Sequence, residues 1–210
     1  MSRNPNCTRC KRTKECTISC DNTPYISRVK EFEFRKGGIV YSCGLPTEGV
    51  FVVRSGSVRL TFSDPFGNAR IARFVWAGEV FGLDSILTER TRLFTAVSRE
   101  FSELCFMTST AFEELVRSDK NRLWRFALLL DGLAHHSDLQ KVEISGGRVR
   151  ERLRNAIARL VSSPTDPAHK AIGSIRQWEL AQYIGVAEET VSRELRRFHR
   201  THLEADSPTR

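Results

Sequence analysis

The chain has 210 residues and a formal net charge of +8, and 40% of its residues are hydrophobic. This length is enough for one large domain or two small ones, each with its own core. No apolar run is long enough to cross a bilayer, and Met1–Asn6 lacks a signal-peptide pattern, so we expect a cytoplasmic protein without a membrane segment. The positive charge suits an anionic partner such as nucleic acid.

Residues 1–22 are predicted to form a cysteine-rich arm. Four of the six cysteines of the chain stand here, with the spacing Cys7-x2-Cys10-x5-Cys16-x3-Cys20. In a reducing cytosol such a group is more often a metal site than a disulfide framework. Thiolates at these intervals can hold an iron–sulfur cluster or a zinc ion, and the spacing alone does not distinguish the two. Because the arm has few apolar residues, we expect bound metal to order it.

Residues 23–117 are predicted to form a β domain that acts as the sensor. Glycines recur here at intervals typical of turns between short strands, and Ser63–Asn68 has the composition of a hairpin loop. Cys43 is expected to be a small buried residue in a strand, and a helix is expected to begin near Ser109. The expected strands are Ile39–Tyr41, Val50–Arg54, Ser57–Ser63, Ala69–Val75 and Thr95–Ser98.

Residues 118–145 are predicted to form one long helix, because Asp119–Glu143 has helical periodicity. Part of this helix carries a heptad-like seam, in which residues alternate at spacings of four and three. Two copies of the helix can pair along such a seam, which predicts a homodimer. The alternative is that the apolar stripe packs on the β domain, and its first half is apolar widely enough for both contacts. Besides Gly132, the seam residues are Leu128, His135, Leu139 and Val142.

Residues 146–210 are predicted to form a DNA-binding domain. A pair of glycines ends the long helix, and an amphipathic helix is expected over Arg148–Val161. Two shorter helices, Gln177–Ile184 and Glu188–His199, then flank Gly185, a residue that tolerates the positive φ of a helix C-terminus. This is the pattern of a helix-turn-helix, whose second helix enters the major groove.

The second helix of this pair carries base-reading chemistry on one face. Glutamate accepts a hydrogen bond from cytosine N4, arginine bonds guanine O6 and N7, and serine contacts either type of base edge. Charged faces are usually just solvated, but the paired helices and the glycine turn favour double-stranded DNA as the partner. The predicted contacts are Glu189, Ser192 and Arg193 for bases, and Arg196 and Arg197 for phosphates.

These features resemble the Crp/Fnr family of transcription regulators, and within it the Fnr branch. The run Glu189–Arg193 after Gly185 resembles the recognition helix of that branch, and Val50–Leu60 resembles the β-roll shared across the family. The resemblance implies an α+β fold with an N-terminal cyclic-nucleotide-binding-like β-roll, a long dimerisation helix and a C-terminal helix-turn-helix domain. The wing that usually follows the recognition helix is expected to be truncated, because the residues after Phe198 are polar.

The same resemblance implies an oxygen sensor built on a [4Fe-4S] cluster. Cys7, Cys10 and Cys16 match the three arm cysteines of the Fnr branch, and Cys105 occupies the place of its distant fourth cysteine. Cys20 is the alternative fourth ligand, because it is local and needs no long loop closure. The family further implies binding to a TTGAT-like palindrome, release of DNA when oxygen degrades the cluster, and contact with RNA polymerase.

A cyclic nucleotide is the weaker sensor hypothesis. Phe81–Ser85 lacks the glutamate that nucleotide-binding members have beside Gly82, and Leu93 stands where those members have a hydroxyl residue after Arg92. Arg92 is therefore expected to be an isolated surface arginine. Zinc, a thiol–disulfide pair and haem remain as other sensors, and an iron–sulfur electron-transfer protein remains as another class. An enzyme is not expected, because no nucleophile with its base is recognisable.

Overall fold

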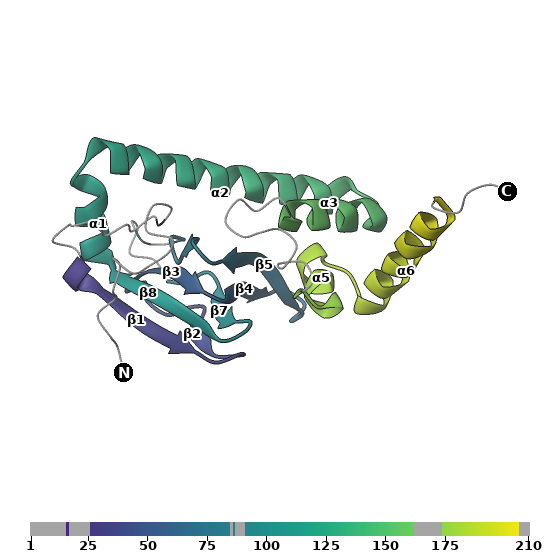
Figure 1. The fold of residues 1–210 in the computed structure, drawn as a ribbon, viewed down its shortest axis with the longest axis horizontal. Coiled ribbons are helices and arrows are strands. Elements are labelled where there is room, and N and C mark those ends of the chain that lie inside the picture. Colours follow the sequence, from purple (N-terminus) through teal and green to yellow (C-terminus); the bar gives the residue numbers. More distant parts are fainter. Residues whose placement is uncertain (1–15, 17–25, 85, 87–90, 162–173, 206–210) are drawn as a thin grey trace. The chain divides into compact units, whose positions relative to one another are not determined.

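The computed structural model describes residues 16, 26–84, 86, 91–161 and 174–205 (Figure 1). The chain divides into two compact units, residues 1–135 and 136–210, and the long helix α2 (Lys120–Gly146) continues from the first unit into the second. In the described ranges, no helix is long and apolar enough to span a membrane. The predicted domain boundaries stay predictions: 1–22, 23–117, 118–145 and 146–210.

The first unit contains two four-stranded antiparallel sheets, with the strand orders β1-β8-β3-β6 and β2-β7-β4-β5. A short 3₁₀ helix, η2 (Ile26–Arg28), precedes the strands, and helix α1 (Ser109–Arg117) follows them. The predicted β domain is therefore confirmed. The strands are β1 (Val29–Phe34), β2 (Ile39–Tyr41), β3 (Gly49–Ser55), β4 (Ser57–Ser63), β5 (Ala69–Trp76), β6 (Val80–Phe81), β7 (Thr95–Ser98) and β8 (Ser102–Thr108).

Three strands, β1, β6 and β8, have no counterpart among those predicted. Strands β1 and β8 mix charged and apolar residues, and β6 has only two residues, too few for a periodic pattern. Strand β8 lies inside its sheet, between β1 and β3. The sequence predicts only that a helix begins near Ser109, soon after Cys105. In the structure Cys105 lies on the central strand β8.

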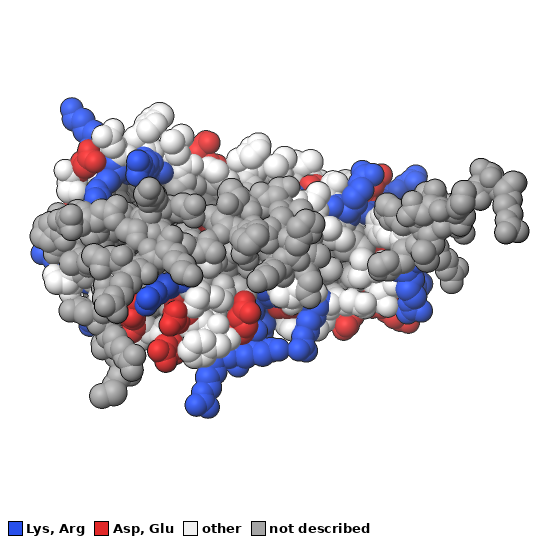
Figure 2. Space-filling view, in the orientation of Figure 1, with Lys and Arg blue, Asp and Glu red and all other residues white. Residues whose placement is uncertain are grey.

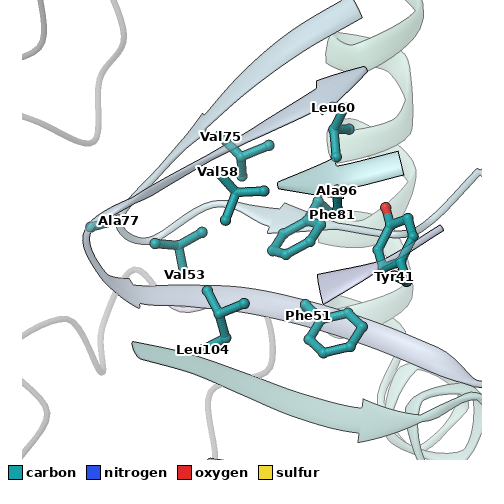
Figure 3. Packing of buried hydrophobic residues seen from close by; sticks show 10 residues of the cluster. All are labelled: Tyr41, Phe51, Val53, Val58, Leu60, Val75, Ala77, Phe81, Ala96 and Leu104. Carbon is teal, nitrogen blue, oxygen red and sulfur yellow. The ribbon is translucent and has the colours of Figure 1, made fainter. Parts of the chain in front are cut away.

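Strand β3 is buried on both faces, because its residues alternate between two separate cores. Phe51 and Val53 point into the space between the two sheets, where side chains from both sheets pack (Figure 3). Val50 and Val52 belong to a second core, which α1 and Phe126 of α2 cover on the other face of the same sheet. This double burial explains why the strand reads as a continuous apolar run.

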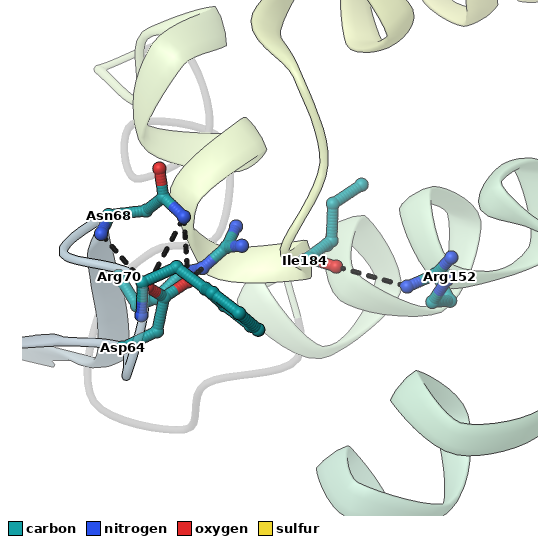
Figure 4. A network of polar contacts seen from close by, with 6 residues as sticks. Asp64, Asn68, Arg70, Arg152 and Ile184 are labelled. Carbon is teal, nitrogen blue, oxygen red and sulfur yellow. Dashed lines mark hydrogen bonds and ion pairs between the residues drawn. The ribbon is translucent and has the colours of Figure 1, made fainter.

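The predicted hairpin loop between β4 and β5 is confirmed. The carboxylate of Asp64 accepts hydrogen bonds from the backbone N–H groups of Phe66 and Asn68 at 3.0 and 2.8 Å (Figure 4). Arg70 Nε donates to the same carboxylate at 3.0 Å. Asp64 therefore fixes the turn through side-chain-to-backbone bonds of the kind that make aspartate common in turns.

The prediction that Cys43 is buried in a strand is wrong. Strand β2 ends at Tyr41, and Cys43 lies exposed in the turn that follows. Its backbone N–H donates to Thr95 Oγ1 at 3.0 Å, and its thiol donates to the carbonyl oxygen of Leu93 at 3.3 Å. The strand ends at Tyr41, as predicted, and Gly44 turns the chain just beyond Cys43 with a φ of +83°.

The second unit holds the helices α3 (Val149–Val161), α5 (Gln177–Ile184) and α6 (Glu188–Ala205). Gly185 caps α5 in the left-handed conformation, with φ 72° and ψ 41°. The predicted helix pair around a glycine turn is thus confirmed. Among the described residues of this unit, the buried side chains are Leu153, Ala156 and Leu160 of α3, Glu179, Leu180, Ala181, Tyr183 and Ile184 of α5, and Val191 of α6.

Two arginines of α3 connect it to its neighbours. Arg152 Nη1 donates to the carbonyl oxygen of Ile184 at 3.4 Å, which links α3 to the end of α5 (Figure 4). Arg159 forms an ion pair with Glu143, which links α3 to the last turns of α2. Helix α3 therefore joins the helix-turn-helix to the end of the long helix.

Helix α6 is longer than predicted. It continues past His199, its predicted end, to Ala205. Residues 201–205 contain leucine, glutamate and alanine and neither glycine nor proline, so nothing in this run stops a helix. The sequence predicts that the wing after the recognition helix is truncated. As far as Ala205, this stretch is part of α6.

Candidate DNA interface and cysteine site

Helix α6 separates an inner face from an outer one. Val191 is fully buried, and Leu195 and Phe198 are half-buried, so the opposite face turns toward solvent. The structure brings all the predicted DNA contacts together on that opposite face. They are Glu189, Arg193, Arg196 and Arg197, which are exposed, and Ser192, which is half-buried.

Two arginines of this face already have partners on the helix. Arg196 Nη2 donates to Ser192 Oγ at 3.1 Å, and Arg197 Nη1 donates to Glu194 Oε1 at 2.7 Å. Within residues 174–198, no side-chain hydrogen bond or ion pair engages Glu189 or Arg193. These last two side chains can therefore reach a base edge without giving up an internal contact.

On the face of the molecule drawn in Figure 2, charge alone does not mark out a DNA-binding surface. Basic and acidic side chains are interspersed over the face of the molecule drawn in Figure 2. The assignment rests instead on the arginines and the glutamate gathered on one face of α6. One neighbouring cation has no counterpart in the sequence prediction: the guanidinium of Arg150, on α3, lies 5.1 Å from the ring centre of Phe198 on α6.

Two predicted cluster ligands lie at one core. Cys16 and Cys105 are both half-buried, and both pack against the second core of the first unit, the one formed by β1, β3, β6, β8, α1 and Phe126. Cys105 reaches this core because it alternates along β8 with Leu104, which points between the sheets. A gap of almost ninety residues in the sequence is thus closed by the fold.

The other predicted ligands, Cys7, Cys10 and Cys20, lie outside the described residues. In the part of the chain that is described, no three His, Cys, Asp or Glu side chains gather as metal ligands. The two predicted ligands that are described, Cys16 and Cys105, fit a thiolate-bound group, because both are half-buried and pack against the same core. The complete ligand set stays a prediction.

The predicted dimer seam is exposed in the single chain. Leu128, Leu139 and Val142 leave 53%, 42% and 69% of their surface open, and His135 is also exposed. Trp124, one turn before Leu128, is 66% exposed. By contrast, Phe126 and Leu129 pack into the second core. Helix α2 therefore uses one side of its first half against the sheet and leaves an apolar side open, as its wide stripe predicts.

The expectation that Arg92 is a surface residue is wrong. Its side chain is only 2% exposed, and its Nη1 and Nη2 atoms donate to the carbonyl oxygens of Gly82 and Gly49 at 2.7 and 2.5 Å. Asp84 Oδ1 lies 3.8 Å from Nη1, and the guanidinium lies 4.2 Å from the ring centre of Tyr41. Sequence spacing gave no signal for this, because the partners come from three separate segments, around Tyr41, Gly49 and Gly82.

Burial governs the charge states of this arginine site. Burial lowers the pKa of the Arg92 guanidinium, whereas the nearby carboxylate of Asp84 raises it. Burial also raises the pKa of the Tyr41 phenol far above its ordinary value, and Asp84 adds to that rise. The site therefore holds a neutral phenol and an arginine already bound to two backbone carbonyls.

Comparison with known proteins gives consistent results across the chain. The family model described as the cyclic nucleotide-binding domain matches residues 31–119. The chain is 30% identical over 162 residues to the cyclic AMP receptor protein of Thermus thermophilus, which covers 77% of this chain and 73% of that protein. It is 23% identical over 205 residues to the fumarate nitrate reduction regulatory protein of Klebsiella oxytoca, covering 90% of this chain and 81% of that protein.

Solved structures show the same fold. FixK2 from Bradyrhizobium japonicum superimposes with a TM-score of 0.71 at 20% sequence identity, over 83% of this chain and 86% of that chain. The similarity extends over both units, since the matched share of this chain is larger than either unit alone.

Proposed function

Since the chain belongs to the Crp/Fnr family of transcription regulators, we propose that it senses oxygen, or a related redox signal such as nitric oxide, through a [4Fe-4S] cluster. The observation that carries this proposal is the packing of Cys16 and Cys105 against one core. The similarity to the fumarate nitrate reduction regulatory protein extends over 90% of the chain and supports the Fnr branch. The proposed ligands are Cys7, Cys10, Cys16 and Cys105.

Cys105 is favoured over Cys20 as the fourth ligand. It lies on a central strand, paired with Glu31 of β1 and Val52 of β3, so its position is fixed before any metal arrives. Cys16, from the arm, packs against the same core. Cys20 needs no long loop closure and stays the alternative ligand.

Ligation at these two cysteines would connect the arm to the start of the long helix. The core that Cys16 and Cys105 contact also contains Phe126 and packs against Leu129, both on the first turns of α2. When bound, the cluster supplies the group that reacts with oxygen. Without ligand bonds to Cys16 and Cys105, the arm would no longer be tied to this core, and the packing beneath α2 would change. A shift of a few kcal/mol is enough to move a balanced dimer equilibrium.

Pairing of α2 helices would then present two DNA-binding domains together. The open seam of α2 supplies the surface, and a two-fold axis would place the two α6 helices about 34 Å apart, one turn of DNA. The proposed target is a TTGAT-like palindrome in double-stranded DNA. RNA polymerase is the further proposed partner, and the cytoplasm is the proposed location.

The deciding test uses the full chain purified without oxygen. We expect a brown protein with the absorption and Mössbauer signals of a [4Fe-4S] cluster, which binds a TTGAT palindrome and loses both colour and affinity in air. A colourless protein that holds zinc would remove the proposed sensor and leave the DNA-binding half intact. A coloured protein that binds no DNA would instead favour an iron–sulfur electron carrier.

Replacing Arg193 by alanine should remove discrimination at one base pair of the half-site. Arg193 is exposed on α6, and within residues 174–198 no side-chain hydrogen bond or ion pair holds it back from a guanine edge. The expected loss is about 1–3 kcal/mol at that position, measured by titrating palindromes with each base pair changed in turn. Arg154→Ala, an exposed arginine on α3, serves as the control. An equal loss on every palindrome would make Arg193 a phosphate contact.

A cyclic nucleotide is the second candidate signal. The match of residues 31–119 to the cyclic nucleotide-binding domain and the 30% identity to a cyclic AMP receptor protein favour it. The engagement of Arg92 with the carbonyl groups of Gly82 and Gly49 weighs against it, because a phosphate would have to displace these bonds. Calorimetric titration of cyclic AMP into the anaerobic protein separates the two, and the absorption spectrum separates haem, zinc and a thiol–disulfide pair.

A further inference from the structure

The contact between Arg196 and Ser192 gives the DNA-facing side of α6 an internal hydrogen bond. The two residues are one helical turn apart, and Arg196 Nη2 donates to Ser192 Oγ at 3.1 Å. Arg196 is exposed and Ser192 is half-buried. The oxygen that would meet a base is therefore already an acceptor from a cation on its own helix.

A serine hydroxyl has one hydrogen to donate and two lone pairs that accept. Without a fixed partner, it can turn either its hydrogen or its oxygen toward a base, so it reads both types of edge. A cationic donor holds the oxygen more strongly than a neutral one. With its oxygen accepting from the guanidinium of Arg196, Ser192 keeps its hydrogen and one lone pair, and the polarising cation favours donation of that hydrogen to an outside partner.

We propose that Arg196 is a positioning residue that makes Ser192 a hydrogen-bond donor in DNA recognition. This inference rests on the proposed binding of a palindrome by α6. As a donor, Ser192 selects base edges that accept, namely purine N7, guanine O6 and thymine O4. It discriminates against a cytosine, whose major-groove edge offers only an amino donor. Arg196 thereby acts on sequence choice through Ser192 and not by touching a base.

Arg197 provides a matched control on the same helix. It is also an exposed arginine, but its guanidinium donates to Glu194, at 2.7 Å, and not to a residue predicted to read bases. An arginine that only meets phosphates weakens binding to all sequences alike. Replacing Arg196 should therefore change the discrimination between sequences, whereas replacing Arg197 should change only the overall affinity.

The test is a double-mutant cycle with Ser192→Ala, Arg196→Ala and the double variant, together with Arg197→Ala. Each protein is prepared without oxygen and titrated with TTGAT palindromes in which each base pair of the half-site is changed in turn. We expect Ser192→Ala to reduce discrimination at one base pair by roughly 5- to 100-fold. Arg196→Ala should lose most of the same discrimination at the same base pair, and the double variant should lose little more. Arg197→Ala should lower affinity by one factor throughout.

Independent effects would overturn the inference. If Arg196→Ala weakens every palindrome by the same factor, or if its effect multiplies with that of Ser192→Ala, Arg196 is a phosphate contact. Alanine is a good helix former, so these variants should keep α6 intact. If the unaltered protein binds none of the palindromes, the proposed function itself fails, which is a separate result.

Discussion

Replacing Cys105 by serine is expected to abolish the cluster of the anaerobic protein. Even changes outside the ligand shell cost ~10–100-fold in metal affinity, so loss of a ligand should cost more than about 100-fold. Serine is close to cysteine in size, and Cys105 is only half-buried, so β8 and its sheet should stay folded. The variant should be colourless by absorption and should bind the palindrome as weakly as air-exposed protein.

Two other cysteines make this experiment selective. Cys20→Ser should keep the absorption spectrum, since its thiol is not the proposed fourth ligand. Cys43→Ser should also keep it, because Cys43 is exposed in the turn after β2 and bonds Leu93. A cluster that survives Cys105→Ser and disappears in Cys20→Ser would assign the fourth ligand to the arm and contradict the role of the shared core.

Replacing Arg92 by methionine is expected to destabilise the first unit by about 3–5 kcal/mol, because it leaves two buried carbonyl groups without their donor and Asp84 without its cation. Methionine fills a similar length but donates no hydrogen bond. The free energy of unfolding of Arg92→Lys should lie between those of the unaltered protein and Arg92→Met. An ammonium group cannot reproduce the fork that reaches both Gly82 and Gly49. Urea unfolding should show the midpoint falling by about 1–3 M for the methionine variant.

An exposed arginine is the control for this loss. Arg117 pairs with Glu113 one turn away on α1, with side chains 76% and 49% exposed, and such pairs contribute about 0.3–0.5 kcal/mol. Arg117→Met should therefore leave the urea midpoint nearly unchanged. An Arg92→Met protein as stable as the unaltered chain would mean that water replaces the guanidinium, and that the site is open enough to admit a ligand.

Strands β3 and β8 of the first unit differ in how well the sequence predicts them. The continuous apolar run of β3 is visible in the sequence, but only the pairing of strands shows that Phe51 and Val52 enter different cores. Strand β8 was not predicted, since its mixed residues have no clean period. Its place between β1 and β3 depends on hydrogen bonds to segments about 50 and 75 residues away.

The DNA-binding helices were predictable because their signals are local. Helical periodicity, a glycine at a left-handed position and a run of base-reading side chains all lie within about 25 residues. Each of these features acts through neighbours along the chain, so tertiary context changes them little. The end of α6 was the exception, because no stop signal distinguishes His199 from Ala205.

By itself, therefore, the sequence determined the helix-turn-helix, the long helix with its apolar stripe, and a glycine-punctuated β domain. Only the tertiary structure decided that Cys16 and Cys105 share a core, that Arg92 is buried between Gly49 and Gly82, and that Cys43 faces solvent. The physical reason is the range of the interactions. Helices and turns form from residues a few positions apart, whereas burial depends on which distant segments the sheets bring together.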